Sequence, residues 1–190
     1  MKRLLLHALG ALLLLAALLP AAHADEARAL EAMRAGGVVI LLRHTTTEPG
    51  IGDPPEFTLG NCATQRNLSA AGREEARRFG EALRAAGVQL AAVRSSRWCR
   101  CLDTARLAYP NTEVQAWPPL DSFFAGQGNR QRQTAEAMAA LTDWPQGRNE
   151  LWVTHQVNVS ALTGFYLMMG EAVVARVRGG ELEVIGRWRP

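Results

Sequence analysis

An arginine and a histidine stand side by side where a strongly apolar segment ends. Residues 38–42 are Val-Val-Ile-Leu-Leu, and Arg43 and His44 follow directly. A run of apolar residues without polar alternation predicts a strand that is buried on both faces, as in parallel sheets. Because ligands of such folds bind outside the carboxyl ends of strands, we expect Arg43 and His44 to lie at a binding site.

Two later segments present the same residue types in the same way. The segment 89–93 runs into Arg94, Ser95-Ser96 and then Arg100, and the segment 151–154 ends in His155. Three parallel strands would bring these side chains to one edge of the sheet. An arginine fork suits phosphate or carboxylate, and a neutral imidazole can act as a nucleophile. Each residue alone is common by chance, so the prediction depends on their joint occurrence.

Strands alternate with helices along the chain, which predicts a three-layer α/β/α sandwich with a mostly parallel central sheet. The residues from Thr45 to Arg66 lack periodicity and predict a long loop at the edge of the site. Turn and capping residues set the other boundaries. We expect helices at 25–35, 70–86 (N-cap Ser69), 97–109 (capped by Ser95-Ser96), 130–141 (Ala135, Met138 and Leu141 inward) and 157–169, strands at 38–42, 89–93 and 151–154, irregular structure at 111–128, and a hairpin of 172–178 with 181–189.

The first 24 residues are typical of a secretory signal peptide. Lys2 and Arg3 precede an apolar run, and Ala22-His23-Ala24 is a small-x-small cleavage site. The alternative is an uncleaved anchor, because about sixteen apolar residues nearly span a bilayer. If the chain is cleaved after Ala24, we expect residues 25–190 to form a single domain that carries the histidine and arginine residues described above. We expect this domain to lie in the periplasm, without stable membrane insertion.

Charge and cysteine content narrow the classes of partner. Removal of Lys2 and Arg3 reduces 21 basic residues to 19 against 18 acidic ones, and no charge block indicates a nucleic-acid partner. Three cysteines in an exported chain predict one disulfide, from Cys62 to either Cys99 or Cys101. A zinc site would need a fourth ligand and a different spacing, so we expect no metal.

Four blocks resemble the histidine phosphatase superfamily, which is also called phosphoglycerate-mutase-like. Its R-H-G signature corresponds to residues 43–45, and its S-S-P-L-x-R-x-x-x-T-A block corresponds to residues 95–105, with Arg97 and Trp98 in place of Pro and Leu. Its L-S/T-x-x-G and V-x-H-G blocks correspond to residues 68–72 and 153–156. Thr45 and Gln156 replace the glycines that follow the two histidines.

A narrower resemblance comes from the loop T-T-T-E-P-G-I-G-D-P-P, residues 45–55, together with the signal peptide. Both are similar to an exported subgroup that includes the lipopolysaccharide core heptose(II)-phosphate phosphatases. The substrate would then be a phosphorylated small molecule or a phosphorylated glycan of the cell envelope.

The superfamily resemblance implies a phosphomonoesterase that needs no cofactor. His44 would form a phosphohistidine, Arg43 and Arg100 would bind the phosphate oxygens, and His155 would hydrogen-bond the transferring group. A phosphomutase and a catalytically silent periplasmic binding protein for phosphorylated glycans are the alternatives. The presence of both histidines and both arginines favours an enzyme, although Arg100 could instead pair with Asp103.

Cleavage of an alkyl phosphate ester also needs a proton donor. Asp121 is the first candidate, because Phe123 and Phe124 nearby could desolvate its carboxyl and favour the protonated form. Glu48, four residues after His44, is the alternative. Asp121 could also simply cap a turn, and the two phenylalanines could either pack in the core or line a sugar site.

Overall fold

The computed structural model describes residues 24–190. The predicted signal peptide and the uncleaved-anchor alternative therefore lie, apart from Ala24, outside the described residues. Within 24–190, none of the helices combines the length and the apolarity that crossing a bilayer requires.

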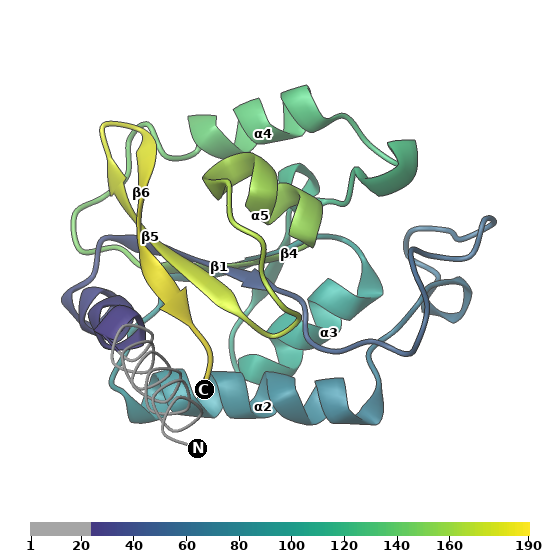
Figure 1. Ribbon diagram of the computed structural model, residues 1–190, viewed down its shortest axis with the longest axis horizontal. Coiled ribbons are helices and arrows are strands. Elements are labelled where there is room, and N and C mark those ends of the chain that lie inside the picture. Colours follow the sequence, from purple (N-terminus) through teal and green to yellow (C-terminus); the bar gives the residue numbers. More distant parts are fainter. Residues whose placement is uncertain (1–23) are drawn as a thin grey trace, which may run out of the picture.

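A six-stranded sheet forms the middle of the molecule, in the order β3-β2-β4-β1-β5-β6 (Figure 1). The first four strands in this order are parallel, and the carboxyl-terminal hairpin adds two antiparallel strands at one side. The predicted mostly parallel sheet is thus confirmed. The strands are β1 (Val38–Arg43), β2 (Ala92–Ser95), β3 (Val114–Ala116), β4 (Glu150–Thr154), β5 (Ala172–Arg178) and β6 (Glu181–Trp188).

Helices cover both faces of the sheet, which confirms the three-layer sandwich. The helical segment 24–35, α2 (Ala70–Ala85) and α3 (Cys99–Ala108) lie on one face, and α4 (Arg130–Ala139) and α5 (Gln156–Thr163) lie on the other (Figure 1). Strand β1 serves both cores because side chains alternate along a strand. Its even-numbered residues pack with α2 and α3, and Val39 and Leu41 pack with α4 and α5.

Helix α2 forms as its sequence predicts. The Ser69 side chain accepts a hydrogen bond from the Gly72 amide, and Ala76, Phe79 and Leu83 face the core. Gly72 also lets the site loop lie close, because a Cβ there would stand 1.8 Å from the Thr46 carbonyl oxygen. The start of the loop is therefore held against α2.

The prediction for β2 and α3 was wrong at the boundaries. Strand β2 begins at Ala92 rather than residue 89, and α3 begins at Cys99 rather than Arg97. Trp98 occupies the N-cap position without a side-chain cap. Trp98 has an extended backbone with φ of −65° and ψ of 136°, so the helix does not include Arg97. The Arg97 amide instead donates to Asp121 at 2.7 Å.

The segment expected to be irregular contains β3 and two short 3₁₀ turns, Pro118–Leu120 and Phe124–Gly126. Helix α4 starts as predicted, but Ala135 is exposed, whereas Leu141 is buried and Met138 packs against the core. Gln133 faces inward instead, because its amide donates to the Asp121 carbonyl at 2.6 Å and so sets the rotation of the helix.

Helix α5 ends at Thr163, six residues before the predicted end at Met169. Gly164 adopts a left-handed conformation with φ of 76°, which stops the helix. The residues between Gly164 and β5 therefore form a loop. This loop returns to the carboxyl edge of the sheet and contributes to the site, a role that a longer helix would have excluded.

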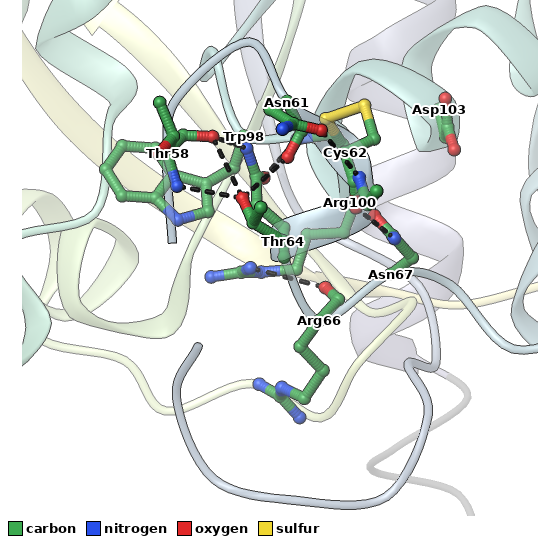
Figure 2. The surroundings of a disulfide bond; sticks show 12 residues. Thr58, Asn61, Cys62, Thr64, Arg66, Asn67, Trp98, Arg100 and Asp103 are labelled. Atoms are coloured by element: carbon green, nitrogen blue, oxygen red, sulfur yellow. Dashed lines mark hydrogen bonds between the residues drawn. A yellow bond between two sulfur atoms is a disulfide. The ribbon is translucent and has the colours of Figure 1, made fainter. Parts of the chain in front are cut away.

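A disulfide between Cys62 and Cys99 fastens the site loop to the start of α3 (Figure 2). This is one of the two predicted pairings, and Cys101 keeps a buried free thiol. Cys99 directly precedes Arg100. The bond therefore ties the loop to the helix turn that carries a candidate phosphate ligand.

Loss of this disulfide should destabilise the fold. The bond closes a loop of 37 residues, which corresponds to about 4 kcal/mol in the chain-entropy account. Cys62→Ser should lower the free energy of unfolding by roughly that amount, measured by urea denaturation. Wild-type protein with a reducing agent serves as the matched control and should behave like the variant. Three reactive thiols in unfolded, unreduced wild-type protein would contradict the pairing.

Candidate active site

The predicted quartet meets in one pocket of about 510 Å³ at the carboxyl edge of the sheet. Arg43 lies level with Thr154 in the β1–β4 register, so His44 and His155 leave two neighbouring strands at the same height. Their ring centroids are 5.5 Å apart. Helix α3 adds Arg100, which is buried like both histidines.

His44 has the protonation state that a nucleophile needs. Its Nδ1 lies 3.0 Å from the Thr45 carbonyl oxygen, which can only accept, so Nδ1 carries the proton and Nε2 keeps its lone pair. Burial, and next the positive charge of Arg100, lower the pKa of His44 from 6.5 to about 3. The imidazole is therefore neutral at neutral pH.

His155 is held from both ring nitrogens. Arg100 Nη2 lies 3.5 Å from Nδ1 and can only donate, so the ring proton sits on Nε2, 2.8 Å from the Ser96 hydroxyl. Burial and the charge of Arg100 lower the pKa of His155 well below 6.5. Because the unfolded chain would take up protons that these two rings exclude, the fold loses stability as the pH falls below about 6.5.

Asp121 lies behind this arrangement and does not line the pocket. Its carboxylate pairs with the Arg97 guanidinium at 2.6 Å and accepts from the Ser96 hydroxyl at 3.3 Å. The expected aromatic surroundings are thus replaced by an arginine. Ser96 connects Asp121 to His155, so Asp121 positions the histidine. The alternative donor, Glu48, is exposed and also lies outside the pocket lining.

Asp53 is the carboxylate that sequence reasoning missed. Its oxygens accept from Arg100 Nη1 at 2.7 Å and Nη2 at 3.1 Å, and further from the Trp98 indole and the Arg66 amide, both at 3.0 Å. The side chains of Arg100 and Asp53 are only 4% and 1% exposed. Burial would raise the pKa of Asp53, but Arg100 outweighs it and holds the pKa below 3.8. The alternative partner of Arg100, Asp103, pairs with Arg73 instead.

Arg66 is a third arginine in the pocket and was also missed. Its Nη1 donates to Thr47 and to the Gly50 carbonyl. The Nε atoms of Arg43, Arg66 and Arg100 are all buried without a hydrogen-bond partner. With Asp53 as the one carboxylate of the lining, the pocket has an excess of positive charge. An anion with several oxygens would offset this charge.

The missed residues share a physical origin. Asp53 and Arg66 belong to the loop between β1 and α2, and Tyr166 and Met169 to the loop after α5. Loops have no side-chain periodicity from which an inward direction can be deduced. The cysteine pair was the one sequence signal that could have placed the first loop beside Arg100. Within residues 24–190, no group of three His, Cys, Asp or Glu side chains is arranged to hold a metal ion.

Neither active-site histidine should titrate in the ordinary range. The ring signals of His44 and His155 in NMR spectra should show no protonation between about pH 7.5 and about pH 5, because burial and Arg100 disfavour the imidazolium. Spectra of His44→Asn and His155→Asn would assign the two signals. A titration near pH 6.5 in either assigned signal would contradict the electrostatic account.

Solved structures of low sequence identity share the fold. YhfR of Bacillus stearothermophilus is 20% identical, with a TM-score of 0.59 over 77% of this chain and 94% of that chain. The protein histidine phosphatase SixA, complexed with tungstate, is 16% identical, with a TM-score of 0.60 and coverages of 80% and 97%. Phosphoserine phosphatase of Entamoeba histolytica is 14% identical, with a TM-score of 0.59 and coverages of 80% and 97%.

A family model gives the assignment that these structures alone do not. No curated protein matches the chain. The model of the histidine phosphatase superfamily, branch 1, matches residues 39–178, from β1 to the end of β5. This range includes both histidines, the three pocket arginines and Asp53. The chain therefore belongs to the histidine phosphatase superfamily (branch 1).

Proposed function

We propose that the protein is a phosphomonoesterase that works through a phosphohistidine on His44. One observation carries the proposal: a buried neutral imidazole with a free Nε2 lone pair shares a pocket with three arginines and one carboxylate. The arginines suit a phosphoryl group, whose charge lies on three equatorial oxygens. The imidazole supplies the nucleophile.

In the first step, Nε2 of His44 attacks phosphorus while the bond between phosphorus and the alcohol oxygen breaks. The ring becomes positively charged, and its Nδ1–H bond to the Thr45 carbonyl stabilises that charge. In the second step, water attacks phosphorus while the bond between phosphorus and Nε2 breaks. A proton of the water passes to the group that protonated the alcohol, inorganic phosphate leaves and His44 returns to neutrality. His155 faces Arg100 through Nδ1, where a bound phosphate would favour a protonated ring that donates a hydrogen bond to it.

The leaving alcohol also needs a proton, and we assign its donation to Asp53. Among the described residues, Asp53 is the one carboxylate in the pocket lining. In the empty pocket Arg100 keeps it ionised. A bound phosphate would compete for Arg100 and bring negative charge beside Asp53, and both effects favour the protonated carboxyl. Asp121 and Glu48 lie outside the lining.

We further propose that the protein is exported and acts on phosphorylated sugars of the cell envelope. Support for export comes from the composition of residues 1–24 and from the disulfide, which is typical of oxidising compartments. The loop resemblance supports an envelope substrate. A phosphomutase and a catalytically silent binding protein are the alternative functions. Measurements of phosphate release distinguish both of them from a phosphatase.

His44→Ala should abolish turnover while the protein stays folded, because no other side chain takes the place of Nε2. Phosphate release from nitrophenyl phosphate should fall by at least about a thousandfold, which is expected when a nucleophile is lost. Rapid quench of the wild type should trap acid-labile phosphate on His44. Circular dichroism checks the fold, and near wild-type turnover in this variant would overturn the mechanism.

Asp53→Asn and Asp121→Asn should differ in their dependence on the leaving group. Asp53→Asn removes both the proposed proton donor and the charge that pairs with Arg100, so it should slow both substrates. Glycerol phosphate should lose about a hundredfold more than nitrophenyl phosphate, because nitrophenolate leaves without a proton. Asp121→Asn should slow both substrates alike, because it acts through Ser96 and His155. If Asp53→Asn also slowed both substrates equally, its role would be limited to positioning Arg100.

A further inference from the structure

Among residues 24–190, most of the exposed large apolar side chains belong to the segments that line the pocket. Ile51 is 91% exposed, Tyr166 69% and Phe124 45%, and all three line the pocket. Phe165 and Met168, also exposed, flank Tyr166 on the same loop. Single exposed apolar residues are ordinary, but a cluster at a pocket mouth usually marks a binding surface.

Three separate segments build this mouth. Ile51 comes from the loop that the disulfide fastens, Phe124 from the turn after η2 (Pro118–Leu120) and Tyr166 from the loop after α5. The first two segments touch, since a Cβ added to Gly52 would lie 3.6 Å from the Phe124 ring. Val157 and Met169 add two further apolar side chains to the lining.

The pocket therefore has a cationic floor and an apolar mouth, which meet where the Arg43 guanidinium lies 5.8 Å from the centre of the Tyr166 ring. The floor holds the three arginines, and the cavity of about 510 Å³ lies in the size range of pockets for small organic molecules, far beyond a single phosphate. The space above the phosphate seat must hold the alcohol part of the ester. Its walls indicate which alcohol fits.

Few groups at the mouth could recognise hydroxyls. The Gln156 amide already donates to Ser160 and the Phe165 carbonyl, and its oxygen accepts from the Leu167 amide. Besides the two histidines, the other neutral polar groups of the lining are the side chains of Ser122 and Gln127 and the hydroxyl of Tyr166. A bare polyol would bring several hydroxyls against apolar walls, where unpaired polar groups are costly.

We propose that this site takes phosphate monoesters whose alcohol carries a hydrocarbon chain, with the phosphate on the arginines and the chain along Ile51, Phe124 and Tyr166. The inference rests on the proposed phosphatase function and narrows its substrates to amphiphilic phosphates. For an envelope sugar, it requires a hydrocarbon chain close to the phosphate.

A series of linear alkyl phosphates, from ethyl to octyl and below their micelle-forming concentrations, tests the proposal. Each added CH₂ group should raise kcat/KM about two- to fourfold until the mouth is filled. Glycerol phosphate should be the poorest substrate. All these esters release an alkoxide, so differences in proton donation contribute little.

Variants at the mouth test which side chains contact the hydrocarbon chain of the substrate. Ile51→Ser and Phe124→Ser should each reduce the slope of log kcat/KM against chain length to about half or less, because they remove apolar contact. Leu59→Ser is the matched control: Leu59 is an exposed apolar residue of the same loop outside the lining of this pocket. It should keep the wild-type slope.

The outcomes separate the two proposals. Provided that nitrophenyl phosphate is hydrolysed, three results would overturn the inference. They are a kcat/KM that does not change with alkyl chain length, a preference for glycerol phosphate, and equal slopes for Ile51→Ser and Leu59→Ser. Absence of phosphate release from every substrate, together with no phosphohistidine on His44, would instead overturn the phosphatase function itself.

Discussion

The site depends on a buried ion pair between Asp53 and Arg100, which joins a loop without regular structure to a helix of the core. Removing both charges from water is costly, and the pair offsets this only because its geometry is bidentate and the remaining acceptor capacity is used. Trp98 and the Arg66 amide supply those extra hydrogen bonds. The Cys62–Cys99 disulfide joins the same loop and helix covalently. An ion pair and a covalent bond thus hold this junction between loop and helix in place.

This junction also determines the chemistry of the neighbouring imidazoles. Asp53 binds the end of the Arg100 guanidinium and leaves its Nε without a partner. The charge of Arg100 also lowers the pKa of both histidines. An isolated buried arginine would be too costly to keep, and Asp53 offsets that cost without removing the excess positive charge of the pocket.

The places where helices end and loops begin decide which side chains surround the pocket. Gly164 stops α5 early, and the chain that follows brings Tyr166 to the mouth. In the same segment, the Leu167 carbonyl oxygen accepts a hydrogen bond from Arg43 Nη1 at 2.6 Å. On the other side, Asp121 organises the turn before α3 and reaches His155 only through Ser96. Substitutions in these loops would therefore change which alcohol part of an ester fits the pocket. They would leave the arginines and histidines unchanged.

The sequence by itself determined the parts of the protein that follow from periodicity and order. The doubly buried β1, the capped α2 and the hairpin were predictable because burial patterns and N-cap chemistry are local. The convergence of Arg43, His44, Arg100 and His155 was predictable because parallel strands end at one edge. Only the tertiary structure decided which carboxylate enters the pocket, that Asp121 pairs with Arg97, where α5 ends and which cysteine meets Cys62. Those outcomes depend on the paths of loops, and a loop path is set by long-range ion pairs and close packing that no local pattern encodes.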